Sequence, residues 1–278
     1  MSESLADIAL AQIEGGRARI PVFDPKAARA QQMLAEGSFE IEELEALIAA
    51  EPALASALLR AANSTFFGGL DKVVSIHEGI LRLGARRSAQ LVVVLGQKQA
   101  HRMGNPQLQA MAERLWSHSL ACALGTDWLV RRLRVPEIEN AAMLAGLLHD
   151  TGKLFLLCVL DDLISSRKLQ FEPTGTLVIQ ILAALHASLG ARLLDEWRIP
   201  DPYRALVLHH HDEEVDESDA LLLAVRLVDG VANKLGIGLE PRPDHDPAGT
   251  LEAQALRVPE VMIAELEIQL EDALAIES

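Results

Sequence analysis

The sequence predicts an all-α protein, a compact bundle of many helices. Half of its 278 residues are hydrophobic but only 4% are aromatic, and leucine and alanine dominate, a mixture that favours packed helices over strands. Apolar residues recur at every third or fourth position along most of the chain, as they do on one face of a helix. The run LVVVL at 91–95 is rich in β-branched residues, but no second candidate strand exists to pair with it. We therefore predict a helix there as well.

The N-terminal third divides into short helices separated by glycine and proline. We expect a helix or tail over 1–16, then a helix over Lys26–Glu36 that follows the two prolines of RIPVFDP. Ser38 is a candidate N-cap for the next helix, and Pro52 suits the first turn of the one after it. Ser75 with Glu78 three residues later forms a predicted capping box.

The sequence of the remainder of the chain predicts longer helices. Two loops separate them: SSRKLQFEPTG at 165–175, and the acidic run DEEVDESD at 212–219, because charge runs are usually solvated. The proline-rich stretch at 237–250 is a third expected loop, and we expect the amphipathic helix after it to pack on its own domain. Helices are predicted over 106–133, 136–150, 153–164, 177–197, 220–236 and 259–275.

Charge and targeting signals narrow the function. A formal net charge of −15 argues against general binding to nucleic acid or to an anionic membrane, since both need a positive field. The N-terminus lacks a basic region and a long apolar run, and charge or glycine interrupts the other apolar runs. Cys122 and Cys158 indicate buried thiols rather than a disulfide framework. We expect a cytoplasmic protein; the sequence leaves its oligomeric state open.

Several histidines and aspartates lie on apolar helix faces. His118, His149 and His186 each have small or apolar neighbours at helical spacing, and Asp229 lies in a strongly apolar helix. A single such histidine is more often a hydrogen-bonded core residue than a ligand. A buried, unpaired aspartate, however, costs several kcal/mol or more. Convergence of these groups predicts a divalent-metal site, and Fe, Mn, Zn and Mg all remain open.

The stretch GLLHDTGK at 146–153 places His149 and Asp150 side by side. We interpret Gly152 as the residue that ends the helix, so that both side chains can turn toward one ion. Lys153 has two open interpretations: a contact for phosphate, or a solvated lysine near a helix end.

These motifs resemble the HD superfamily of metal-dependent phosphohydrolases, and most closely its HDOD branch. WSHSLA matches the first histidine helix, AGLLHDTGKL the His-Asp element, HASLGARLLDEWRIP the third segment and LLLAVRLVDGVANKLG the closing aspartate helix. In the family a histidine pair follows the tryptophan of the third segment by 13 and 14 residues. The spacing from Trp197 gives His210 and His211, and leaves His209 without a role. The resemblance implies the metal ligands His118, His149, Asp150, His186, His210, His211 and Asp229.

The N-terminal half carries the signal specific to HDOD. Two segments typical of that family have similar counterparts here, AAEPALASALLRAANSTFFGG and SIHEGILRLGARRSAQLVV. The resemblance implies an HDOD domain over 17–240, made of a helical half (17–105) and an HD-like half (106–240), with 241–278 as linker and final helix. It implies a bundle used in bacterial signalling, often with no demonstrated catalysis.

Two functions follow from the resemblance. In the first, the chain is a regulatory module that binds signalling proteins or a nucleotide ligand. In the second, it is a metal-dependent phosphohydrolase or phosphodiesterase: His118, His149, Asp150 and Asp229 hold one metal, and the other three histidines hold a second, bridged by Asp150. Asp150 and Lys153 would then be the catalytic residues, with Lys153 steadying the phosphate.

Two departures from the family pattern favour the regulatory function. Related cyclic-di-GMP phosphodiesterases carry a Gly-Tyr-Pro loop after the histidine pair, whereas this chain has the acidic run at 212–219. Clustered acids repel a phosphate-rich ligand. Those enzymes also often have an acid one turn before the first histidine, where this chain has Arg114.

Overall fold

The computed structural model consists of helices and connecting segments. It describes residues 4–16, 18, 25–37, 39–64, 67, 71–96, 102–169, 171–199 and 201–275, and these contain no strand. The predicted all-α class is therefore confirmed. The run at 91–95 lies inside α6 (Ala85–Gly96), as predicted.

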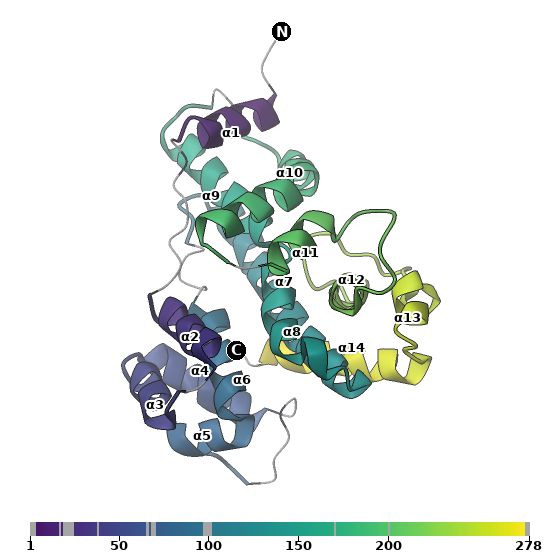
Figure 1. Cartoon of the computed structure of the whole chain (residues 1–278). Helices are drawn as coiled ribbons and strands as arrows, with labels where there is room; N and C mark the ends of the chain where they lie inside the picture. The colour runs from purple at the N-terminus through teal and green to yellow at the C-terminus, as the bar shows by residue number, and fades with distance from the viewer. Residues whose placement is uncertain are drawn as a thin grey trace.

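Five helices form one lobe of the molecule (Figure 1). A proline in the first turn begins α4, and the Ser75–Glu78 capping box begins α5 as predicted. Met33, Leu44 and Leu58 are fully buried between these helices. The lobe consists of α2 (Pro25–Glu36), α3 (Ile41–Ala49), α4 (Pro52–Asn63), α5 (Ile76–Leu83) and α6.

The second lobe is built around α7 (Pro106–Leu133), a helix of 28 residues that is about 42 Å long at 1.5 Å per residue. Trp116, Leu115 and Cys122 of α7 belong to three different apolar clusters, so this helix joins both lobes. Around it lie α1 (Leu5–Glu14), α8 (Pro136–Leu148), α9 (Thr151–Ser165), α10 (Gly175–Glu196), α11 (Tyr203–His209) and α12 (Ala220–Lys234).

The C-terminal segment covers α7. It contains the 3₁₀ turn η3 (Pro247–Gly249), α13 (Leu251–Ala255) and α14 (Glu260–Ala275), which packs against α7 (Figure 1). Ile263, Leu266 and Leu270 of α14 are buried in one core with residues of α7 and α12. The prediction that this helix packs on its own domain is confirmed.

Some predicted boundaries differ from the structure. The N-cap of α3 is Glu40, and Ser38 lies outside the described residues. The helix expected to reach Asp150 ends at Leu148, and the short helix α13 was not predicted. Gly152 does not end a helix, because it lies in the first turn of α9.

Two stretches are long and apolar enough to cross a bilayer by length and composition: the helical pair 136–165 and helix α10. Within them, 83% and 50% of the tested windows are buried inside the protein. Core helices of proteins in water pass the same test, so neither stretch indicates a membrane span.

Glycines allow the helices that carry the predicted ligands to approach closely. A Cβ on Gly146 would lie 2.4 Å from the carbonyl oxygen of Cys122 on α7. A Cβ on Gly152 would lie 1.9 Å from the carbonyl oxygen of His186 and 2.8 Å from the backbone nitrogen of Gly190. These contacts place α8 against α7 and α9 against α10. The role of Gly152 is therefore close packing rather than helix termination.

We expect Gly152→Ala to lower the free energy of unfolding by about 3 kcal/mol, since the new methyl group meets backbone atoms that cannot rotate away. Urea denaturation followed by circular dichroism measures this change. Gly175→Ala is the matched control, because a Cβ there meets only side-chain ends of Gln107 and Met111 at 3.1 and 3.3 Å. Equal stability of the two variants would contradict the close-packing role.

Candidate metal centre

The seven predicted ligands meet in one cluster inside the second lobe. The side chains of His149 and Asp150 project from the junction at which α8 ends and α9 begins. All seven are buried except Asp229, which is half-buried, and His211, which is exposed. The other helices contribute His118 (α7), His186 (α10), His210 and His211 (directly after α11) and Asp229 (α12).

One group of ligand atoms surrounds the Nε2 atom of His118. That nitrogen lies 3.1 Å from Oδ1 of Asp229, 3.3 Å from Nε2 of His149 and 3.6 Å from Oδ2 of Asp150. Nε2 of His149 also lies 3.5 Å from Oδ2 of Asp150. These four side chains could therefore share one cation.

A second group faces the other oxygen of Asp150. Its Oδ1 atom lies 3.4 Å from Nε2 of His186 and 3.6 Å from Nε2 of His210. The two nitrogens are 3.3 Å apart, and the His211 ring centre is 4.1 Å from that of His210. Because each oxygen of Asp150 faces a different group, this carboxylate is placed to bridge two cations.

The spacing of these atoms fits metal coordination. Ligands held about 2.1 Å from an ion in tetrahedral or octahedral geometry lie about 3.0–3.4 Å from one another, close to the separations here. The histidine rings are also oriented for metal binding, because a backbone group occupies the ring nitrogen that faces away from the cluster. In His118, His149, His186 and His210, Nδ1 is within 2.8–2.9 Å of a backbone carbonyl oxygen, of Ile237, Gly146, Leu182 and Val207 respectively.

An Nδ1–H that donates to a carbonyl leaves Nε2 with a free lone pair directed into the cluster. The Oδ1 atom of Asp150 supports the same conclusion, because it is buried and has no hydrogen-bond donor within the described residues. A buried acceptor without a partner is costly. A divalent cation in each group would satisfy both the carboxylate and the imidazoles.

The electrostatics of the cluster keep its carboxylates ionised. Burial opposes ionisation of Asp150, but Lys153 and the surrounding histidines hold its pKa well below its usual range. Burial also opposes ionisation of Asp229, while its contacts with His118 and His149 hold its pKa well below its usual range. Burial lowers the pKa of His186 to about 4, so that this ring is neutral at pH 7 and able to bind a metal.

Lys153 is largely buried and ion-paired, which decides against one of its two predicted roles. Its Nζ donates to Oδ2 of Asp150 at 2.7 Å, and its side chain is only 12% exposed. The solvated-lysine interpretation is therefore wrong. His209 points away to Asp212 at 2.8 Å, in agreement with its lack of a predicted role. Arg114 donates to the carbonyl of Gly238.

The sequence interpretation missed one member of the cluster. Cys122, predicted to be a buried thiol, has its Sγ atom 3.6 Å from Nε2 of His118, within the group that also contains His149 and Asp229. The signal was present in the spacing, because Cys122 lies four residues after His118 on α7 and thus on the same helix face. Thiolates favour zinc and other soft metals over magnesium.

We expect Cys122→Ser to weaken zinc binding by about tenfold or more while leaving manganese binding nearly unchanged, because only the soft ligand is lost. Competition with a chromophoric chelator measures both affinities. The matched control is Cys158→Ser, on the neighbouring helix α9 and outside both ligand groups. Equal effects of the two substitutions on zinc binding would contradict a ligand role for Cys122.

Comparisons with known proteins identify the family and the fold of the chain. The HDOD domain family matches residues 20–213. A Shewanella amazonensis structure named for a suspected metal-dependent phosphohydrolase has a TM-score of 0.77 at 16% identity, over 99% of this chain and 98% of the other. An HDOD domain protein of unknown function from Geobacter sulfurreducens has a TM-score of 0.73 at 18% identity, over 98% and 97% of the two chains.

Two further proteins are longer than this chain. A suspected signal transduction protein from Marinobacter aquaeolei has a TM-score of 0.66 at 17% identity, over 100% of this chain and 60% of the other. An uncharacterized Treponema pallidum protein is 24% identical over 197 residues, which are 69% of this chain but 38% of that protein. The match at 20–213 includes the helical lobe and most of the cluster. The chain therefore belongs to the HDOD domain family.

Proposed function

We propose that this chain is a bacterial signal-transduction module in which a two-metal centre holds the HD-like half together, and that it acts by binding partner proteins or a nucleotide rather than by turnover. The observation that carries the proposal is the number of protein ligands. His118, Cys122, His149 and Asp229 form one group of four, and Asp150, His186, His210 and His211 form the other.

Four protein ligands complete a tetrahedral site. Structural metal sites are closed in this way, whereas catalytic sites keep a position open for water or substrate. The first group also has Oδ2 of Asp150 within reach, which would complete it further. A full set of protein ligands supports a structural or regulatory ion over a reactive one.

The position of Lys153 supports the same function. The ammonium of Lys153 is ion-paired with Asp150, which takes one of its three N–H donors and part of its charge. The ion pair raises the pKa of Lys153 above its usual range although burial opposes the charge. The lysine thus keeps Asp150 ionised and oriented between the two groups. Bound cations would supply the remaining positive charge that two buried carboxylates require.

The helical lobe gives further support. The described residues of 25–96 contribute no side chain to either ligand group, and they form an apolar core that also takes in Trp116 of α7 and Met143 of α8. A lobe of this size that is not needed for the centre is available for recognition of a partner. The chain spans 38% of the length of its Treponema relative.

The test is to remove the metal and measure both stability and turnover. Protein purified with zinc, iron or manganese is expected to contain up to two ions per chain by elemental analysis. A strong chelator should lower the melting temperature by 5 °C or more, taking roughly 2–4 °C per kcal/mol for a chain of this size. Assays with generic phosphodiesters and cyclic nucleotides should show no turnover in any metal form.

The alternative is a metal-dependent phosphohydrolase, and one observation favours it. Asp229 is 19% exposed and His211 lies at the protein surface, so solvent reaches one side of the cluster. If either side chain leaves its ion, a position opens for water or a phosphate. Turnover that requires added metal and is lost in both His149→Ala and Asp150→Ala would establish this alternative.

A further inference from the structure

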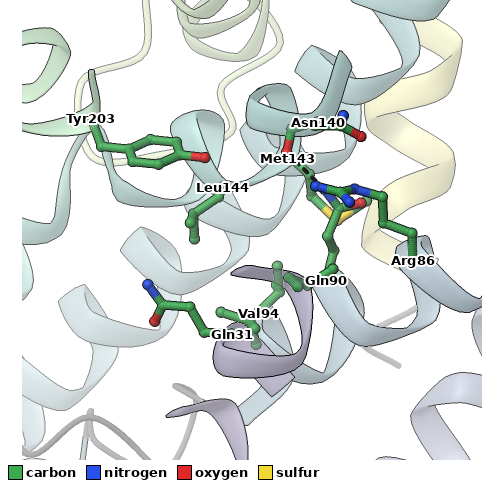
Figure 2. A pocket seen from close by; sticks show the side chains of 10 residues that line it. Gln31, Arg86, Gln90, Val94, Asn140, Met143, Leu144 and Tyr203 are labelled. Carbon is green, nitrogen blue, oxygen red and sulfur yellow. Dashed lines mark hydrogen bonds between the residues drawn. The ribbon is translucent and has the colours of Figure 1, made fainter. Parts of the chain in front are cut away.

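A cavity of about 180 Å³ lies between the two lobes, lined by α2, α6, α8 and the start of α11. Figure 2 shows Tyr203 and Leu144 on one side, Gln31 and Val94 below, and Gln90 with Arg86 on the other. None of its lining residues belongs to the metal cluster. The cavity is therefore a second candidate site, distinct from the proposed metal centre.

The wall of the cavity is largely apolar. Val93, Val94 and Met143 are buried there, and Leu144 is half-buried. A dry apolar cavity of about 150 Å³ holds a benzene molecule. A space of about 180 Å³ therefore fits one six-membered ring with one or two small substituents.

Polar groups at the cavity lack partners within the described part of the chain. Gln90 is 4% exposed and donates from Nε2 to the carbonyl of Asn140 at 3.1 Å, but its Oε1 atom is buried and has no donor. A buried amide oxygen of this kind needs an N–H or O–H group. A ligand that fills the cavity can provide that donor.

Arg86, in contrast to Gln90, needs an acceptor or an anion. Its side chain is exposed at the mouth of the cavity, and it forms no ion pair or hydrogen bond with another described residue. Burial raises the pKa of the nearby Tyr203 phenol, so the hydroxyl stays neutral at pH 7, although Arg86 partly offsets that effect. The mouth thus carries one unpaired positive charge and one neutral hydroxyl, which suit a carboxylate.

We propose that this cavity is an effector site for a monocyclic aromatic carboxylate that bears a hydroxyl or amino donor. The ring packs between Val94 and Leu144, the donor reaches Oε1 of Gln90, and the carboxylate meets Arg86. The size of the cavity selects one ring over a whole nucleotide.

The site shares two helices with the metal cluster. Helix α8 supplies Met143 and Leu144 to the cavity and leads directly into His149. Helix α11 begins at Tyr203 and ends beside His210. Occupation of the cavity therefore changes metal affinity, and by reciprocity the metal changes ligand affinity by the same factor. This regulatory link rests on the proposed metal centre, whereas binding to the cavity does not.

Binding is tested by isothermal titration of the full chain, with and without metal, using 4-hydroxybenzoate as probe. About ten non-hydrogen atoms are expected to give a Kd of roughly 0.1–1 mM. Benzoate lacks the donor and 4-hydroxybenzyl alcohol lacks the charge, so each should bind about tenfold more weakly. Tighter binding of adenosine monophosphate than of 4-hydroxybenzoate would overturn the ligand class.

Substitutions of the lining residues test each proposed contact with the ligand separately. Arg86→Gln should weaken binding of 4-hydroxybenzoate about tenfold, while Arg132→Gln, which removes the same charge from an exposed position on α7, should not change it. Gln90→Met should erase the preference for 4-hydroxybenzoate over benzoate, a change that a general loss of structure would not produce. Leu144→Phe fills the space and should abolish binding in a protein with an unchanged circular dichroism spectrum.

No saturable binding to the unsubstituted chain, or binding unaffected by Arg86→Gln and Gln90→Met, would overturn the site. The regulatory link is tested separately by zinc titrations with and without saturating 4-hydroxybenzoate. Ligand binding with an unchanged zinc affinity would overturn the link. Ligand binding by a chain that takes up no metal would refute the proposed metal centre and the link, but not the cavity site.

Discussion

Asp150→Asn is expected to weaken metal binding strongly at both positions while the protein stays folded at room temperature. Its two carboxylate oxygens face different ligand groups, 3.6 Å from His118 Nε2 and 3.4 Å from His186 Nε2. An amide can offer one neutral oxygen at most, and its NH₂ group would point at the other ion. We expect each affinity to fall by at least about 100-fold.

Elemental analysis and chelator competition measure this loss. The variant also leaves the Lys153 ammonium without its counter-charge, so its melting temperature should fall as well. Asp127→Asn is the matched control, since Asp127 is a fully buried aspartate that belongs to neither ligand group. An Asp150→Asn protein that retains two ions per chain would contradict the bridging role.

The second large effect is expected at Asp127 itself, on stability rather than metal. This carboxylate is 0% exposed and pairs with Arg87 Nη2 at 2.9 Å and Arg131 Nε at 3.0 Å. Loss of one partner leaves the charges of the others uncompensated. We expect Asp127→Asn to lower the free energy of unfolding by about 3 kcal/mol, at the low end for buried ion pairs because Arg131 is 37% exposed.

The ion pair also joins the two lobes, because Arg87 lies on α6 and Asp127 on α7. Urea denaturation is therefore expected to show earlier unfolding of the helical lobe in Asp127→Asn. Asp212→Asn, which removes an exposed aspartate paired with His209, should change stability by less than about 0.5 kcal/mol. Similar stability of the two variants would show that the Asp127 pair does not stabilise the lobe contact.

Local signals in the sequence were sufficient to predict where most helices lie. Pro106 at the first turn gives α7 its predicted start, and Ser75 with Glu78 forms the expected capping box. Such signals act over three or four residues, so they are readable without a tertiary structure. Boundaries set by packing were less predictable. The helix expected to reach Asp150 ends at Leu148, and Gly152 proved to be a contact point between α9 and α10.

The amino-acid sequence by itself predicted which histidines and aspartates gather in the second lobe, because the order and spacing of their motifs resemble those of the HDOD domain family. It also determined the all-α class, through composition and apolar periodicity. Only the tertiary structure decided that Cys122 enters the cluster, that each oxygen of Asp150 faces a different group, and that Lys153 is ion-paired. The physical reason is distance along the chain: contacts between helices far apart in sequence depend on packing, which no local pattern encodes.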